Sequence, residues 1–258
     1  ERCSERIKSA AKDLEELGIG GSAAGTGLNT HPDYARRVCD ILRKDTGVHF
    51  RDAVDKREAM QSQRPVSEVS SALKNLALEL NRISNDLRLM ASGPTTGFAE
   101  IVLPAAQAGS SIMPGKVNPS FPEMINMVCY QVMGNDLTIS MAVQAGQLEL
   151  NVMMPVMGHN LLFSIEILKN GIGKFTEKCV KGITADRERC RRYAEMSMSL
   201  VTALNPIIGY AKAAEIVKEA MASGKTIVET IRLKNVIPAD KLDEVLNLKA
   251  LTEPGVHK

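Results

Sequence analysis

The sequence contains no tryptophan and only 4 tyrosines and 5 phenylalanines among its 258 residues. So few aromatic rings exclude the stacking platforms that bind single-stranded nucleic acid. The net charge of +2 lacks the strong excess of one sign that favours a nucleic-acid partner. No apolar run reaches the roughly 18 residues of a membrane span, and no stretch has the pattern of a signal peptide. We therefore expect no nucleic-acid partner, no membrane association and a cytoplasmic location.

The cysteines and histidines lack the spacing of a ligand set. The five cysteines are odd in number and widely separated, and none forms a Cys-x-x-Cys pair. The four histidines show no metal-ligand spacing either. The sequence therefore predicts reduced, buried thiols of a cytosolic protein, with no zinc, no disulfide, no metal and no cofactor.

Helical periodicity dominates what is present. Long helices are predicted over about 67–92, 122–145 and 150–181, the last one kinked at Pro155, and shorter ones follow Gly182. No stretch alternates convincingly like a strand. The fold class is therefore all-α, with a long-helix bundle over 1–182 and a small helical C-terminal domain over 183–258. Apolar residues wrap broadly around the helices at 122–145 and 150–181, which predicts burial against partner subunits.

One loop, residues 109–119 with the sequence GSSIMPGKVNP, concentrates the residues able to do chemistry. Two glycines and two prolines shape its backbone, and Lys116 is its only charged residue. The loop leads into the predicted helix at 122, whose N-terminus favours anions. An ordinary tight surface turn is the alternative for a loop of this composition.

This string resembles the GSSxMPxKxN signature of the aspartase/fumarase superfamily, in which the loop closes over a dicarboxylate. The resemblance implies that Ser110 is the catalytic base and that Ser111 donates to the substrate. Lys116 and Asn118 would bind a carboxylate. Met113 and Glu123 would have supporting roles, with Glu123 orienting a histidine carried elsewhere. The resemblance also implies a homotetramer whose central helices form one core, and 1–182 would be part of the family's central domain.

Other segments extend the resemblance. The glycine-rich run Gly21 to Asn29 is similar to the family's GGTAVGTGLN, whose small residues allow close helix approach. We do not expect this run to bind a nucleotide, because no strand precedes it and no Gly-Lys-Ser/Thr follows. His31 is expected to be a cap or a solvent contact. Thr95 departs from the family pattern, which has an arginine nearby.

The resemblance covers nearly the whole chain but only the later half or so of a family member. The first residues, Glu-Arg-Cys, read as the middle of a helix, which suggests a fragment or a processed chain. Segments that bind the second carboxylate and supply a threonine–histidine pair have no counterpart here. We therefore expect the isolated chain to be inactive.

Two segments favour ammonia over water as the leaving group. Gln107-Ala108 and the stretch from Ala145 to Val152 look like aspartases, whereas fumarases carry SGNFELNVFRP-like residues at the second position. The predicted function is aspartate ammonia-lyase, with fumarate hydratase as the close alternative. A non-catalytic helical assembly module and an unrelated anion-binding bundle are the remaining readings.

Overall fold

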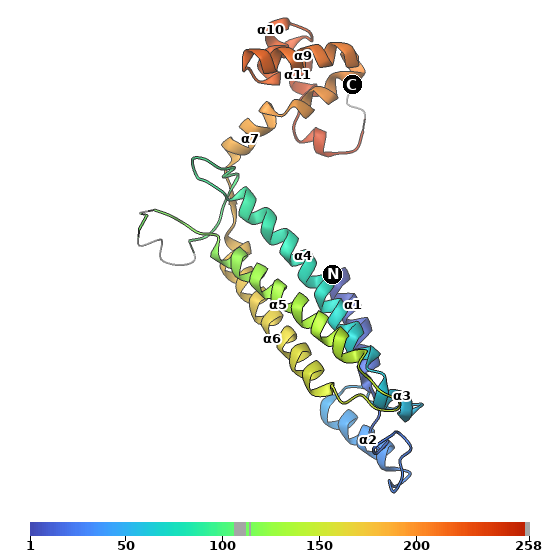
Figure 1. The fold of residues 1–258 in the computed structure, drawn as a ribbon. Coiled ribbons are helices and arrows are strands. Elements are labelled where there is room, and N and C mark those ends of the chain that lie inside the picture. Colours follow the sequence, from blue (N-terminus) through green and yellow to red (C-terminus); the bar gives the residue numbers. More distant parts are fainter. Residues whose placement is uncertain (106–111, 114, 256–258) are drawn as a thin grey trace. The chain divides into compact units, whose positions relative to one another are not determined.

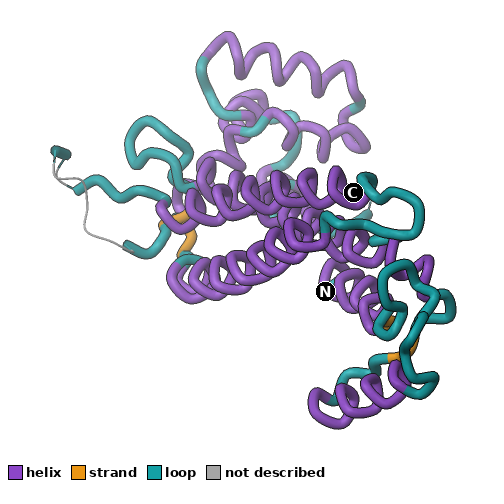
Figure 2. The backbone as a smooth tube through the Cα atoms, turned by 60° about the horizontal axis from the view of Figure 1, so that its bottom comes forward, coloured by secondary structure: helices purple, strands orange, loops and turns teal. Residues whose placement is uncertain are grey.

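The computed structural model describes residues 1–105, 112–113 and 115–255. Helices make up most of the described chain (Figures 1 and 2). The strands are pieces of two residues each. The helices are α1 (Arg2–Ala11), α2 (Tyr34–Thr46), α3 (Lys56–Gln61), α4 (Arg64–Met90), α5 (Ser120–Val143), α6 (Met154–Lys178), α7 (Arg187–Met196), α8 (Asn205–Ile208), α9 (Tyr210–Ser223), α10 (Ile227–Lys234) and α11 (Ala239–Val245). Turns of 3₁₀ helix cover Lys12–Glu15, Val180–Gly182, Met198–Leu204 and Ala250–Thr252. The all-α fold class is confirmed, and no described helix is long and apolar enough to cross a bilayer.

The first of two compact units contains Glu1–Ser92 and Leu103–Ile183. In it α4, α5 and α6 run side by side, and α1 packs against α4 (Figure 1). Val69 and Leu73 of α4, Ile125 and Val132 of α5, and Leu168 of α6 are buried together in its core. This is the long-helix bundle that the periodicity predicts.

Buried polar side chains also join the three long helices. Asp136 of α5 accepts hydrogen bonds from the Ser70 hydroxyl at 2.7 Å and from the Lys74 ammonium at 2.6 Å, both on α4. On its other side, α5 presents Asn135, which donates to the Ser164 hydroxyl of α6 at 2.9 Å. These partners satisfy polar groups that would be costly to bury alone.

The connection between α5 and α6 is held by Asn151, which is fully buried. Its side-chain amide donates to the carbonyls of Ala142 and Val143 at the end of α5, and its carbonyl accepts from the Met153 N–H at the start of α6. The predicted kink at Pro155 is wrong, because α6 begins at Met154 and Pro155 lies in its first turn. Proline is tolerated there, since its missing N–H would have no intrahelical partner.

The second unit contains Gly93–Val102 together with Thr184–Lys258. Strand β3 (Ile101–Val102) pairs antiparallel with β4 (Thr184–Ala185). The guanidinium of Arg189 donates to the carbonyl of Pro94 at 3.0 Å, so an arginine of α7 holds the loop in which Thr95 departs from the family pattern. A separate core unites the short helices through Leu200, Leu204, Ile216, Ile227, Ile231 and Leu242.

The sequence shows no convincing strand alternation, and the described chain contains four strands of two residues each. Besides β3 and β4, strand β1 (Glu16–Leu17) pairs in parallel with β2 (Arg51–Asp52). These pieces are too short to show alternation in the sequence, and their pairing joins segments far apart along the chain.

Candidate functional site

The signature loop leads directly into α5, which begins at Ser120. The predicted base Ser110 and its neighbour Ser111 lie outside the described residues. Within the described part, the Lys116 N–H donates to the Met113 carbonyl at 3.2 Å, which closes a turn around Gly115 at φ +77°. The structure thus places the loop's end at a helix start, where backbone N–H groups and the helix dipole favour negative charge.

Lys116 and Asn118 are both exposed. Neither side chain has a hydrogen bond or ion pair among the residues that the structure describes. Met113 is also exposed, at 57%. An exposed ammonium group and an exposed carboxamide lying two residues apart could together bind a carboxylate, the ammonium as a point charge and the amide as a donor.

Glu123 lies in the first turn of α5 and is half-buried. Its backbone N–H donates to the Pro119 carbonyl at 3.0 Å. A carboxylate is stabilised in this position by the helix dipole. No ion pair of Glu123 is recorded in the described part of the chain.

Two buried side-chain contacts fix the start of α5 against α4. The Ser84 hydroxyl donates to the Pro122 carbonyl at 2.7 Å, and Ser84 is fully buried. The Asn126 amide donates to the side-chain oxygen of Asn81 at 2.7 Å, while its own carbonyl accepts from the Arg88 guanidinium at 3.2 Å. The helix that follows the loop is therefore anchored within its first two turns.

The anchoring residues were missed in the sequence analysis. Asn81, Ser84 and Arg88 are spaced i, i+3 and i+7, so they share one face of α4. Three polar residues on one face of a long helix are the pattern that could have indicated polar contacts with a neighbouring helix.

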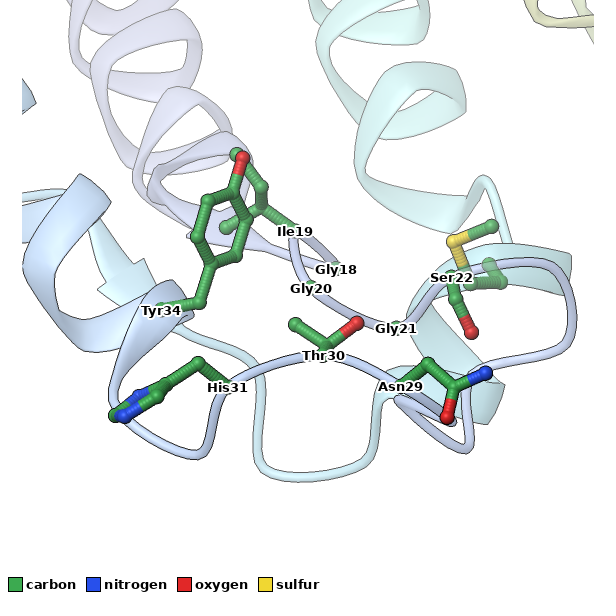
Figure 3. A pocket seen from close by; sticks show the side chains of 10 residues that line it. Gly18, Ile19, Gly20, Gly21, Ser22, Asn29, Thr30, His31 and Tyr34 are labelled. Atoms are coloured by element: carbon green, nitrogen blue, oxygen red, sulfur yellow. The ribbon is translucent and has the colours of Figure 1, made fainter.

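The glycine-rich run packs tightly against α3, as its small residues predict. A Cβ on Gly25 would lie 2.4 Å from both the N and the Cα of Arg57. Beside the run lies an open cavity of about 600 Å³, whose lining includes Gly21, Thr30 and Tyr34 (Figure 3). Among the described residues, no lysine or arginine lines this cavity, which therefore has no described cation of the kind expected at a phosphate site. His31 is exposed and accepts a hydrogen bond from the Asp33 N–H through Nδ1 at 3.1 Å, just before α2, but it does not cap the helix, whose N-cap residue is Asp33.

An apolar stripe on α5 is exposed. It consists of Met127, Tyr130, Leu137 and Met141, each between 54% and 63% exposed. Gly134 completes the three-and-four spacing, which places all five on one face of the helix. On α6, Leu162 is 68% exposed. Exposed apolar residues therefore form a continuous stripe on α5 and include Leu162 on α6.

All five cysteines are free, and Cys39, Cys129 and Cys179 are buried. Burial raises the pKa of the Cys129 thiol to about 11 and also raises the pKa of the Cys179 thiol. Cys129 is therefore a neutral thiol near pH 7, and the thiolate is the nucleophilic form.

Comparison with protein families gives two matches. The lyase family model matches residues 1–134, and the model of the fumarase C C-terminus matches residues 200–253. An aspartate ammonia-lyase from Bacillus sp is 48% identical over 98% of this chain and 54% of its own length. The aspartate ammonia-lyase of Bacillus subtilis is 46% identical over 99% of this chain and 54% of its own length. A class II fumarate hydratase of Staphylococcus haemolyticus is 41% identical over 98% of this chain and 55% of its own length.

Solved structures agree with the helical fold. A fumarate lyase:delta crystallin from Brucella melitensis, solved with cobalt bound, superposes with a TM-score of 0.93 at 43% identity, covering 98% of this chain and 55% of the other. A class II fumarase from Schistosoma mansoni gives a TM-score of 0.89 at 37% identity, covering 95% of this chain and 54% of the other. The chain thus spans about half the length of the relatives it matches.

Proposed function

Since this chain belongs to the aspartase/fumarase family of lyases, we propose that it is the signature-loop half of an aspartate ammonia-lyase, which converts L-aspartate to fumarate and ammonia. The observation that carries the proposal is the loop itself. Its two predicted carboxylate ligands, Lys116 and Asn118, are exposed immediately before α5, and their side chains have no partner among the described residues.

The choice of ammonia over water has two supports. The aspartate ammonia-lyases named above are 46–48% identical to this chain, against 41% for the fumarate hydratase. The segments at 107–108 and 145–152 also have aspartase-like residues. Fumarate hydratase is the second candidate, because that relative covers the chain equally well and the fumarase C-terminal model matches residues 200–253.

The chemistry requires a base and a place for developing negative charge. In the proposed reaction, Ser110 as alkoxide takes a proton from the carbon next to a substrate carboxylate. The carbanion's electrons spread into that carboxylate, then form the new double bond as the C–N bond breaks and ammonia leaves. Because the carboxylate is already negative, donors that stabilise its second charge should contribute the most to the rate. Lys116, Asn118 and the start of α5 would supply that stabilisation.

Glu123 supports a composite site. A half-buried carboxylate at this helix start would repel a dianionic substrate unless a cation or a proton donor faced it. The resemblance assigns that role to a histidine on a segment that this chain does not contain. The second carboxylate of the substrate would be bound by other such segments. We therefore propose that the site forms only when further chain segments contribute, and that this chain alone has no activity.

The exposed apolar stripe on α5 and the exposed Leu162 of α6 support a homotetramer. An apolar stripe with three-and-four spacing is the pattern that packs helix against helix between subunits. The five free thiols fit a cytoplasmic location, where cysteines stay reduced.

The proposal is tested by following fumarate absorbance with L-aspartate as substrate. The assay compares this chain alone with the chain mixed with the upstream half of Bacillus subtilis aspartate ammonia-lyase. Activity only on mixing, together with a tetramer by sedimentation, is the expected result. Turnover of malate without aspartate would move the assignment to fumarate hydratase. A folded tetramer that turns over neither substrate would favour an assembly role without catalysis.

A further inference from the structure

We infer that Asn126 is a positioning residue for the signature loop, assisted by Ser84. Both residues hold the first two turns of α5 on α4, and so fix the position of the helix start that Lys116 and Asn118 immediately precede. The inference rests on the proposed function in one respect, namely that the loop residues act on a substrate.

Local hydrogen bonds connect the first turn of α5 to the loop that precedes it. Pro122 has no N–H to donate, and the Ser120 N–H turns back to the Asn118 carbonyl at 2.8 Å. The Glu123 N–H also donates to the Pro119 carbonyl, at 3.0 Å. These bonds stay within one segment of the chain, so the position of the turn on the bundle depends on its contacts with α4.

Those neighbouring contacts are short, buried and polar. Ser84 reaches the Pro122 carbonyl, which lies within the first turn. Asn126 lies one turn further and is only 2% exposed. Its amide donates to both the side-chain oxygen and the backbone carbonyl of Asn81, at 2.7 and 3.3 Å, and its oxygen accepts from Arg88. A carboxamide with partners on both ends permits one position of α5 along α4, whereas apolar contacts alone would tolerate sliding.

The same bonds could serve only to stabilise the bundle, and the chain provides a matched control for that possibility. Asn135 lies nine residues further along α5 and is 3% exposed. It also bonds to a neighbouring helix, through the Ser164 hydroxyl. Asn126→Ala and Asn135→Ala therefore remove the same group from the same helix at equal burial, one beside the loop and one far from it.

The experiment uses the active assembly of this chain with the upstream half of Bacillus subtilis aspartate ammonia-lyase and measures kcat, KM and the thermal midpoint of each variant. Asn126→Ala is expected to lower kcat about 10- to 100-fold, because small misplacements of catalytic groups have effects of that size. Asn135→Ala should keep kcat within about 3-fold at a comparable loss of thermal midpoint. If both variants lose kcat in proportion to their thermal midpoints, or if neither loses it, the inference is wrong.

A second readout is independent of the reaction. Amide hydrogen exchange of residues 115–124 should speed up in Asn126→Ala and stay unchanged in Asn135→Ala. If the unsubstituted assembly turns over neither aspartate nor malate, the proposed function fails while the exchange comparison still decides the positioning role. Should Asn126→Ala not fold, Ser84→Ala tests the same point with a smaller change, an expected 3- to 10-fold loss of kcat. Its control is Ser70→Ala, which removes a buried hydroxyl at the other end of α4.

Discussion

Replacing Gly25 by alanine should destabilise the protein more than the same change at another left-handed glycine. Gly25 has φ +80°, and an added Cβ would lie 2.4 Å from two backbone atoms of Arg57 at the start of α3. Backbone atoms cannot rotate out of the way as a side chain can. The substitution must therefore push the glycine-rich run away from α3.

Gly47 provides the reference. It has φ +75° at the end of α2, and nothing lies within 4 Å of the position that its Cβ would take. Alanine in the left-handed region costs about 1–2 kcal/mol. Alanine also lowers the conformational entropy of the unfolded chain, which offsets about 0.4–1 kcal/mol of this cost. Gly47→Ala should therefore lower the free energy of unfolding by about 1 kcal/mol, and the overlap at Gly25 should add about 1–3 kcal/mol more.

The assay is urea unfolding followed by far-ultraviolet circular dichroism, with the slope m checked for each variant. An unchanged m means that the shift in midpoint reports stability alone. Equal midpoints for Gly25→Ala and Gly47→Ala would refute the reasoning, since the contact with Arg57 would then relax at no cost.

Two further predictions concern buried polar groups in the bundle. Lys74→Met leaves the Asp136 carboxylate with Ser70 alone and should lower the free energy of unfolding by about 2 kcal/mol, reduced from the fully buried case because the lysine side chain is 35% exposed. Adding Asp136→Asn should recover most of this loss in a double-mutant cycle, and strictly additive effects would count against the ion pair. Cys129 makes stability depend on pH, because burial raises its pKa from 9.0 to about 11. The stabilisation that the neutral, buried thiol gives to the folded state is complete below pH 9 and is lost as pH rises toward 11. The free energy of unfolding should fall by about 3 kcal/mol over this range, and Cys129→Ala should abolish this pH dependence in urea titrations.

The sequence by itself determined the long helices. Their apolar spacing fixes α4 and α5 to within a few residues of the predicted ends, because burying one face of a helix needs that period. The signature loop was likewise found from residue type and order, with Lys116, Asn118 and Glu123 at the start of α5. Whether Ser110 acts as the base stays a prediction, since it lies outside the described residues.

Only the tertiary structure decided which groups meet across helices. Asp136 and Lys74 lie 62 positions apart in the sequence, and Asn126 and Asn81 lie 45 apart, so no local pattern pairs them. Pro155 was misread because a proline can kink a helix or begin one, and the burial of Asn151 beside it decides which. Periodicity records which face of a helix is apolar, whereas the choice of neighbour for each polar group follows from how the helices pack.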